Sequence, residues 1–343
     1  MPYEAFFAMK DQKSSSKMAR ATLGRLELRC PPLPQTLIEA TKLIDEPEQL
    51  EVGPVTEMVQ RDPIVVAKLL HIVNSAYYGL RRTINSVERT VVMLGPVAVA
   101  GIVVGMNILK LNSILEGPAG RCFNQLVRHS IATAFLVRHL MEGSPRKNKG
   151  FAKGKAARVG VSFTVGLLHD FGKIILIYNY PEEALVLYEQ RALRRQLIVP
   201  DVRDVEQLVF GCDHTEAGEF VARKLGFPDS LTDVIRFHHE PKCTSGDAET
   251  DRLVRATAAA NLAAKAMGFA FEQPLNWEAI AGDPIWKMIL EHDLPHFGEV
   301  ALLIEDFQQQ QEHLVQYVNA MTVGPEPPSE KRQTTKRPMT YGL

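Results

Sequence analysis

The sequence has no excess of either charge, few cysteines and no long apolar run. Its 343 residues include 39 Lys and Arg against 40 Asp and Glu, which gives a formal net charge of −1. Without a positive excess, we do not expect a protein that holds nucleic acid by bulk charge. The four cysteines lie far apart with no Cys-x-x-Cys pair. This pattern predicts reduced, mostly buried thiols and excludes a disulfide framework or a zinc knuckle.

The longest apolar run is Val97 to Val104, extended past Gly105 to Leu109. A membrane-spanning helix needs about 20 apolar residues, so this run predicts a buried helix. The first residues include acids and lysines and no apolar segment followed by a cleavage site of small residues. We therefore expect a cytoplasmic protein that does not bind a membrane.

The composition, 45% hydrophobic and 23% charged, is typical of a globular chain. Strand-like alternation is hard to find, whereas helix start and stop signals are frequent. Asp62 before Pro63 and Ser86 are predicted N-caps, and Gly226 followed by Pro228 is a predicted helix end. The sequence therefore predicts an all-α fold. The longer helices are expected at about residues 121–141, 159–176, 181–195, 202–210, 215–225, 230–237, 251–267 and 297–320.

Pro- and Gly-containing joints divide the chain into expected regions. Residues 1–24 form an N-terminal extension, and residues 25–270 form the main domain. Within it, a helical subdomain over 25–115 precedes a second helical subdomain over 120–270. Residues 271–320 are expected to add C-terminal helices. Residues 321–343, rich in Pro, Lys, Arg and Thr, are expected to be disordered.

Several of the ten histidines lie within or directly after apolar helical stretches, and some lie next to another potential ligand residue. His129 lies on the inner face of a predicted helix, and His169-Asp170 follows the apolar run Val165-Gly-Leu-Leu. His214 comes directly after Asp213, and His238-His239-Glu240 closes a helix before Pro241. A lone inner histidine is more often a hydrogen-bonded core residue than a ligand. Two doublets after apolar helical stretches favour a site, although sequence distance alone does not bring them together.

Imidazole and carboxylate groups suit Fe, Mn, Zn or Ni. Neighbouring residues on a helix differ by about 100°, so His169 and Asp170 can approach one ion, or two, from different sides. Such a centre would activate a water for attack on a phosphoester. Lys173 lies three residues after Asp170, on nearly the same face, where it could neutralise a phosphate oxygen.

The segment from Val165 through His169-Asp170-Phe-Gly-Lys to Leu176 resembles the central helix of the HD superfamily of metal-dependent phosphohydrolases. More specifically, residues 25–270 resemble the HDOD family, the HD-related output domain of bacterial signalling proteins. The residues that carry the resemblance are Pro31-Pro-Leu-Pro, Asp62-Pro63, Lys68-Leu-Leu-His-Ile-Val-Asn-Ser-Ala-Tyr-Tyr, Ile84-Asn-Ser-Val, Val91-Val-Met-Leu-Gly, Arg128-His129-Ser130, His169-Asp170, Glu206 to Asp213-His214, Gly226-Phe-Pro and His238-His-Glu-Pro.

The resemblance implies an HD-type helical domain with an N-terminal helical subdomain. It also implies metal-ligand positions where residues match: His129, His169, Asp170, His214, His238 and His239. At the position of the closing acidic ligand of catalytic relatives, this chain has Asn261, whose amide is neutral and a weaker ligand. Glu240 or Asp213 could substitute for the missing carboxylate. The Gly-Tyr-Pro signature of cyclic-dinucleotide phosphodiesterases is absent after Glu240, which argues against cyclic-di-GMP hydrolysis.

Two functions from different classes follow from the resemblance. The first is a non-catalytic or weakly catalytic signalling module that binds a protein partner or a nucleotide or phosphoester ligand. The second is a metal-dependent phosphohydrolase of a nucleotide or another phosphoester, with Asp170 and Lys173 as catalytic residues. Both use a pocket for one or two divalent ions (Fe, Mn, Zn, Ni or Mg). The absence of the closing carboxylate favours the signalling module.

Overall fold

The computed structural model describes residues 28–42, 51–111, 115, 117–142, 153–193, 201–242, 245–271 and 275–322. These residues form helices and turns and no strand, so the all-α prediction is confirmed. The elements in chain order are α3 (Gln35–Lys42), α4 (Val52–Gln60), α5 (Pro63–Val73), α6 (Val87–Leu94), α7 (Pro96–Lys110), α8 (Gly117–Glu142), α9 (Lys153–Leu168), α10 (Phe171–Asn179), α11 (Pro181–Leu193), α12 (Val202–Phe210), α13 (His214–Leu225), α14 (Asp229–Phe237), α15 (Ala248–Ala264), η3 (Lys265–Phe269), α16 (Trp277–Ile280), α17 (Pro284–His292), η4 (Pro295–Phe297), α18 (Val300–Gln309) and α19 (Gln311–Thr322).

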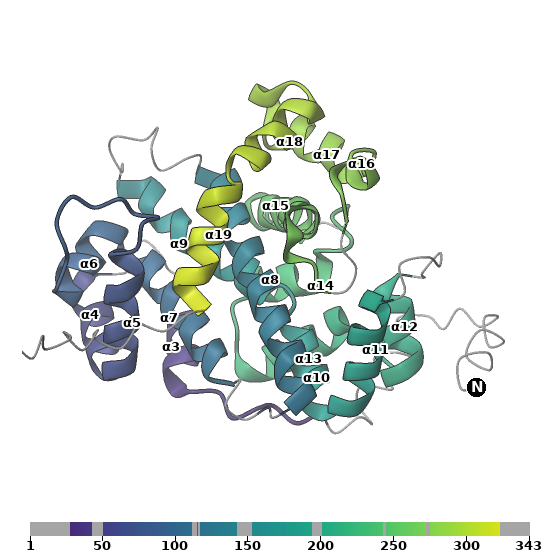
Figure 1. The fold of residues 1–343 in the computed structure, drawn as a ribbon, viewed down its shortest axis with the longest axis horizontal. Helices are drawn as coiled ribbons and strands as arrows, with labels where there is room; N and C mark the ends of the chain where they lie inside the picture. Colours follow the sequence, from purple (N-terminus) through teal and green to yellow (C-terminus); the bar gives the residue numbers. More distant parts are fainter. Residues whose placement is uncertain are drawn as a thin grey trace, which may run out of the picture.

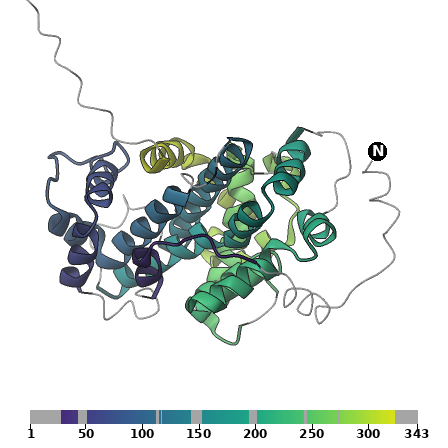
Figure 2. The same ribbon diagram turned by 90° about the horizontal axis from the view of Figure 1, so that it is seen from below.

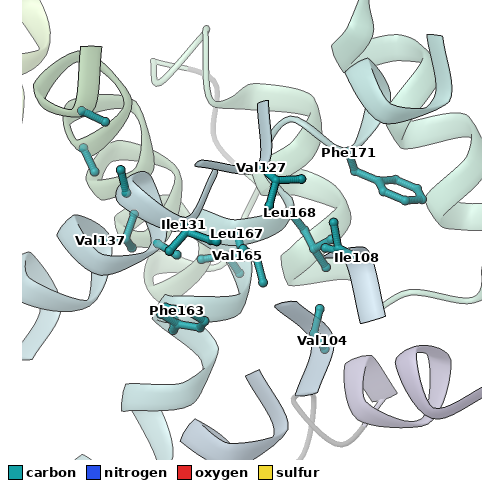
Figure 3. Packing of buried hydrophobic residues seen from close by; sticks show 14 of the residues in the cluster. Val104, Ile108, Val127, Ile131, Val137, Phe163, Val165, Leu167, Leu168 and Phe171 are labelled. Atoms are coloured by element: carbon teal, nitrogen blue, oxygen red, sulfur yellow. The ribbon is translucent and has the colours of Figure 1, made fainter. Parts of the chain in front are cut away.

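Helices α3 to α7 lie at one end of the molecule, and α10 to α14 lie at the other (Figures 1 and 2). The long helix α8 packs on α9, which also packs on α7, so this pair joins the two ends. The close-up in Figure 3 shows the resulting apolar contact, to which α7, α8 and α9 contribute Val104 and Ile108, Val127 and Ile131, and Val165 and Leu168.

The last helix, α19, returns to the middle of the molecule and packs on α8, α5 and α7 (Figure 1). Its Tyr317 meets Tyr77 and the Arg138 side chain, which lies 5.4 Å from the centre of the Tyr317 ring. Arg138 also donates a hydrogen bond to the Tyr77 hydroxyl. A buried arginine among aromatic rings therefore ties α19 to α8 and to the segment that follows α5.

The predicted helix signals operate as expected. Asp62 accepts hydrogen bonds from the backbone N–H groups of Ile64 and Val65 at the start of α5, with Pro63 in the first turn. Ser86 caps α6, and Gly226 ends α13 with a φ of 68°, a left-handed conformation that favours glycine. Cys122 and Cys212 are buried free thiols as predicted, whereas Cys30 is exposed; Cys243 lies outside the described residues.

Three predicted helices are wrong in extent. The helix expected over 159–176 is two helices, α9 and α10, separated by a turn at His169 and Asp170. The helix expected over 297–320 divides at Gln310 into α18 and α19. The helix expected over 251–267 leaves α geometry at Lys265, where the π-helical turn η3 begins. The predicted domain boundaries stay predictions, and the tail over 321–343 lies almost wholly outside the described residues.

Within the described residues, one stretch is long and apolar enough to cross a membrane by length and composition, Val161–Asn179. Of its most apolar window, 89% is buried inside the protein. The bent pair α6 and α7 passes the same test if it is counted as one span, with an angle of 113° between the two helices. Burial of this kind is what the core helix of a soluble protein shows.

Candidate metal centre

Four separate parts of the chain bring histidines to one carboxylate, Asp170. His129 comes from the middle of α8, and His169 precedes Asp170 in the turn between α9 and α10. His214 is the first residue of α13, whose start is fixed by a capping box of Asp213 and Glu216. His238 and His239 follow α14 directly.

The distances show how closely these groups converge. Asp170 Oδ2 lies 3.4 Å from His169 Nε2 and 3.7 Å from His129 Nε2. The other carboxylate oxygen, Oδ1, lies 3.4 Å from His214 Nε2 and 3.6 Å from His238 Nε2. The ligand atoms of Asp170, His214, His238 and His239 all lie within 4.8 Å of one another, as do those of His129, His169 and Asp170.

The backbone fixes the orientation of three imidazole rings. His129 Nδ1 lies 2.8 Å from the Phe269 carbonyl oxygen, and His169 Nδ1 lies 2.7 Å from that of Gly166. His238 Nδ1 lies 3.1 Å from the carbonyl oxygen of Ile235. Since a carbonyl oxygen only accepts, Nδ1 carries the proton in each ring, and Nε2 of the neutral ring presents a lone pair. These lone pairs face the Asp170 carboxylate.

His214 is oriented by a buried carboxylate that sequence reasoning had not assigned a role. Glu206 Oε2 lies 2.6 Å from His214 Nδ1 and accepts a hydrogen bond of 2.9 Å from the His214 backbone N–H. The other oxygen of Glu206 accepts from the Tyr188 hydroxyl at 2.7 Å. A carboxylate behind an imidazole is the usual outer partner of a metal-ligating histidine. In the sequence, Glu206 belonged to one of the segments that carry the resemblance, but no role was predicted for it.

The centre leaves several buried acceptor atoms without a hydrogen-bond partner among the described residues. They are Nε2 of His129, His169 and His239, and Oδ1 of Asp170. Such atoms are costly to bury unless something satisfies them. Lone pairs gathered around a carboxylate repel one another, and a cation between them removes that repulsion. The donor set of imidazoles with one carboxylate therefore fits a divalent transition-metal ion.

Four of the candidate ligands, His129, Asp170, His238 and His239, have pKa shifts toward the protonation state that a metal ligand requires. Burial lowers the pKa of His129 and of His238 to about 3 and that of His239 well below its usual value, which keeps these rings neutral. Burial alone would raise the pKa of Asp170, but His169 and Lys173 hold it well below the usual range. Burial also opposes protonation of His214, yet Glu206 raises its pKa overall.

Lys173 lies on α10, one turn after the carboxylate. Its Nζ is 3.1 Å from Asp170 Oδ2, and both side chains are inaccessible to solvent. The aromatic ring of Phe271 lies beside the same ammonium, with its centre 5.5 Å from Nζ. The sequence placed Lys173 next to Asp170, and the structure shows a buried ion pair at that position.

Two glycines let the supporting helices approach closely. A Cβ atom on Gly172 of α10 would lie 1.7 Å from the His214 carbonyl oxygen. A Cβ atom on Gly218 of α13 would lie 2.6 Å from Ile235 Cγ2 and 3.0 Å from the Gly172 nitrogen. The helix that follows Asp170 can therefore contact the helix that begins with His214 only because both positions lack a side chain.

The residues considered as substitutes for the missing carboxylate are engaged elsewhere. Glu240 accepts a hydrogen bond from Arg203 at 2.7 Å. Asp213 Oδ1 caps α13 by accepting from the Glu216 backbone at 2.9 Å. Neither belongs to a group of converging ligand atoms in the described part of the chain. Asn261 is buried on α15, and its Oδ1 has no hydrogen-bond partner there.

Most of the centre is closed to solvent, whereas His239 is partly exposed. His129, His169, His214 and Lys173 have no exposed surface, and Asp170 and His238 are 1% exposed. A cavity of about 520 Å³ lies at the far end of α10, lined by Arg29, Tyr178, Asn179 and Tyr180. There the Asn179 side chain accepts a hydrogen bond from the Arg29 N–H and donates one to its carbonyl.

Comparison with known proteins places this geometry in context. A family model, described as the HDOD domain, matches residues 30–241. A curated protein from Treponema pallidum (strain Nichols), described as uncharacterized, is 25% identical over 228 residues, or 66% of this chain. The match covers 41% of that relative, so the chain spans about two fifths of its length.

Solved structures show the same fold. An HDOD domain protein of unknown function from Geobacter sulfurreducens is 20% identical, with a TM-score of 0.67 over 89% of this chain and 96% of its own. A protein from Shewanella amazonensis SB2B, described as a proposed phosphohydrolase, is 18% identical, with a TM-score of 0.57 over 89% of this chain and 98% of its own. A proposed signal-transduction protein from Marinobacter aquaeolei VT8 is 18% identical, with a TM-score of 0.62 over 90% of this chain and 66% of its own.

Proposed function

Because the chain belongs to the HDOD family, we propose that it is a regulatory module of bacterial signal transduction that holds a divalent cation in its buried centre. The observation that carries this proposal is the orientation of the imidazoles. Three rings use Nδ1 on backbone carbonyls and His214 uses Nδ1 on Glu206, while Nε2 of His129 and His169 has no hydrogen-bond partner in the described residues. Purely structural histidines would satisfy both nitrogens.

The residues that would hold the cation are His129, His169, Asp170, His214, His238 and His239. A bound divalent ion polarises phosphoryl oxygens and lowers the pKa of a coordinated water. Asp170 supplies the negative charge nearest to the cation, Lys173 forms an ion pair with Asp170, and Glu206 fixes the tautomer of His214. The metal is Fe, Mn, Zn, Ni or Mg, as one ion or two, and the donor set favours a transition metal.

The closure of the centre supports a regulatory role over efficient turnover. A substrate must reach the reacting groups, and Asp170 and Lys173 are sealed from solvent by surrounding helices. We propose that helical surfaces bind a protein partner in the cytoplasm and that the centre sets the conformation of those surfaces. Nucleic acid does not fit a chain with a net charge of −1.

A metal-dependent phosphohydrolase is the second candidate. The buried pair of Asp170 and Lys173 favours it, because an ammonium beside the metal-facing carboxylate suits a phosphate oxygen. Two of the structural neighbours, both from Shewanella amazonensis SB2B, are described as proposed phosphohydrolases. A transient opening of the centre would be required for this activity.

Metal analysis of the purified protein, followed by hydrolysis assays, separates the candidates. Wild type is loaded with Mn or Fe and assayed with generic phosphodiesters, beside Asp170→Ala and the control Asp62→Ala. Asp62 also pairs with a lysine, Lys110, but lies outside the centre. We expect metal in wild type and the control, its loss in Asp170→Ala, and no turnover. Turnover that disappears only in Asp170→Ala would establish the hydrolase, and metal-free wild type would contradict both candidates.

A further inference from the structure

The loop between α5 and α6 has its two ends fixed to each other. The Asn74 side chain donates to the Ile84 carbonyl oxygen at 2.8 Å and accepts from the Ile84 N–H at 2.8 Å. Its amide also donates to the Leu70 carbonyl oxygen in α5 at 2.7 Å. Surface loops whose ends are closed in this way are compact and frequently functional. Residues 75–83 are therefore held as one unit at the end of the molecule formed by α3 to α7 (Figures 1 and 2).

The inner side of this loop is anchored by aromatic contacts. Tyr77 packs against Phe135 of α8 and Tyr317 of α19, with distances of 5.5 and 4.9 Å between ring centres. Arg138 donates a hydrogen bond to the Tyr77 hydroxyl. The backbone then turns at Gly79, whose φ of 56° lies in the left-handed region that favours glycine. The residues after this turn are therefore presented on a well-packed base.

The outer side of the loop and the adjoining face of α6 are basic. From Gly79 to Leu94 the sequence has three arginines, Arg81, Arg82 and Arg89, against one acid, Glu88. All three arginines are exposed. In the part of the chain that the structure describes, their guanidinium groups form no ion pair and no hydrogen bond. A chain with a net charge of −1 therefore gathers uncompensated positive charge at this place.

Two exposed aliphatic side chains accompany these arginines. Leu80 precedes Arg81 in the loop and is 36% exposed, and Val92 on α6 is 65% exposed. Val92 lies three residues after Arg89, so the two share one face of the helix. Only residues 83–86 separate the loop arginines from α6. Together these exposed residues form what we call the basic surface, made of Leu80, Arg81, Arg82, Arg89 and Val92.

We propose that the basic surface docks an acidic peptide segment of a protein partner, in which carboxylate side chains are interspersed with aliphatic ones. Guanidinium groups suit carboxylates because their planar N–H groups can donate two parallel hydrogen bonds. Leu80 and Val92 would contact the aliphatic side chains of the segment. Because the loop is already fixed at both ends, little ordering is needed on binding. The proposal rests on the proposed function and deepens it, since it names the surface and the chemistry of the partner.

The basic surface fits a peptide better than a nucleic acid. Surfaces that bind single-stranded nucleic acid combine basic side chains with aromatic rings on which bases stack. The aromatic residues of this loop, Tyr77 and Tyr78, are partly buried and pack on the hydrophobic core. The exposed neighbours of the arginines are aliphatic instead. A nucleic acid would therefore find charge here but no stacking partner among the residues of the basic surface.

Fluorescence anisotropy with the full chain tests the docking site. The probe is a short fluorescein-labelled peptide of repeating Glu-Glu-Leu units, compared with a Gln-Gln-Leu peptide of the same length and an oligothymidylate of the same charge. We expect the acidic peptide to bind, and its affinity to fall as the salt concentration rises. The other two probes should bind at least about tenfold more weakly, because one lacks charge and the other lacks aliphatic groups.

Charge reversal locates the binding. Arg81→Glu/Arg82→Glu changes two exposed side chains, so the fold should be kept, and affinity for the acidic peptide should fall at least about tenfold. The control, Lys224→Glu/Lys287→Glu, makes the same change in net charge on α13 and α17 and should stay within about twofold of wild type. Val92→Ser should weaken binding about threefold, through lost apolar contact. Circular dichroism of each variant checks its helix content.

Each outcome bears on the docking site or on the proposed function. Failure of the acidic peptide to bind wild type, or equal affinity in wild type and Arg81→Glu/Arg82→Glu, would overturn the docking site. Bound metal in the purified protein would then still support the proposed function. Tighter binding of oligothymidylate, lost in the same variant, would assign the surface to nucleic acid and overturn the peptide. Peptide binding through these arginines in a metal-free chain would keep the docking site and contradict the proposed cation centre.

Discussion

Buried polar groups are treated differently in two regions of the molecule, one formed by α3 to α7 and the other by α8 to α15. In α3 to α7, Thr41, Thr56, Thr90 and Asn107 each donate to a carbonyl oxygen three or four residues earlier in the chain. In α8 to α15, His129, His169 and His238 use one ring nitrogen on a backbone carbonyl and direct the other at Asp170. The first arrangement is complete within the fold. The second leaves Nε2 of His129 and of His169 without a hydrogen-bond partner in the described residues.

Acid should therefore destabilise the region α8 to α15, which contains these histidines, before it destabilises α3 to α7. His129 and His238 have folded-state pKa values of about 3, below their unfolded value of 6.5. The stability they contribute is present above pH 6.5 and is lost as the pH falls toward 3, because the unfolded chain takes up the protons. We expect chelator-treated protein to lose about 2 kcal/mol for each of these histidines between pH 7 and pH 5. His214, whose pKa is raised, opposes this trend.

Denaturant titrations from pH 7 to pH 5, with hydrogen exchange, check this expectation. Exchange in α8 to α15 should accelerate before exchange in α4 to α7. Equal acceleration at both ends, or stability that does not change with pH, would show that the histidines are not held neutral by burial.

A glycine pair tests the difference in packing. Gly172→Ala places a methyl group 1.7 Å from the His214 carbonyl oxygen, so the backbones must separate, and we expect a loss of about 3 kcal/mol. Gly105→Ala in α7 meets the ends of flexible side chains, Met321 Cε at 3.0 Å and Leu167 Cδ2 at 3.2 Å. Since alanine also favours the helix, its effect should stay within about 1 kcal/mol of zero. Chemical denaturation of both variants measures the contrast, and equal losses would contradict it.

The outer carboxylate can be tested without touching a ligand. Glu206→Gln keeps the size of the side chain but weakens the acceptor behind His214, so metal affinity should fall about 10- to 100-fold. Tyr188→Phe removes only the hydrogen bond to the other oxygen of Glu206, and its effect should be smaller. Calorimetric titration with Mn²⁺ under one set of buffer conditions compares them. Unchanged affinity in Glu206→Gln would mean that His214 is not a ligand.

The smallest effect concerns two hydroxyl groups. Thr90→Val removes a hydroxyl that donates to the Ser86 carbonyl at 2.9 Å, and we expect a loss of about 1 kcal/mol. Thr133→Val in α8 removes a buried hydroxyl without a hydrogen-bond partner in the described residues, so stability should be unchanged or should rise by up to about 1 kcal/mol. Thermal unfolding of both variants is the measurement. A loss of stability in Thr133→Val as large as that in Thr90→Val would contradict the prediction.

Local signals predicted much of the fold. Side-chain caps such as Asp62 and Ser86, and the glycine stop at Gly226, act within one turn of a helix and can be read from neighbouring residues. The break between α9 and α10 could not be predicted this way, because the apolar pattern continues through it and the turn is fixed by contact with α13. The division at Gln310 likewise lacks a glycine or proline.

The site was partly accessible to the same reasoning. His169, Asp170 and Lys173 are close in sequence, so their proximity followed from helix geometry. The resemblance supplied the other histidines, and their role as metal ligands stays a prediction. The position of Glu206 behind His214 could not be predicted from sequence, because a single buried charge has no pattern of its own and its neighbours come from other helices.

The contact at Gly172 has a consequence for how this centre can vary. The backbone oxygen that faces Gly172 belongs to His214. The distance between α10 and α13 therefore also sets the position of the His214 imidazole. A side chain added at Gly172 would push His214 away from Asp170, although every candidate ligand residue is still present in the sequence. The spacing of the candidate ligand atoms therefore depends on the absence of a side chain at Gly172. A comparison limited to the candidate ligand residues would not detect this dependence.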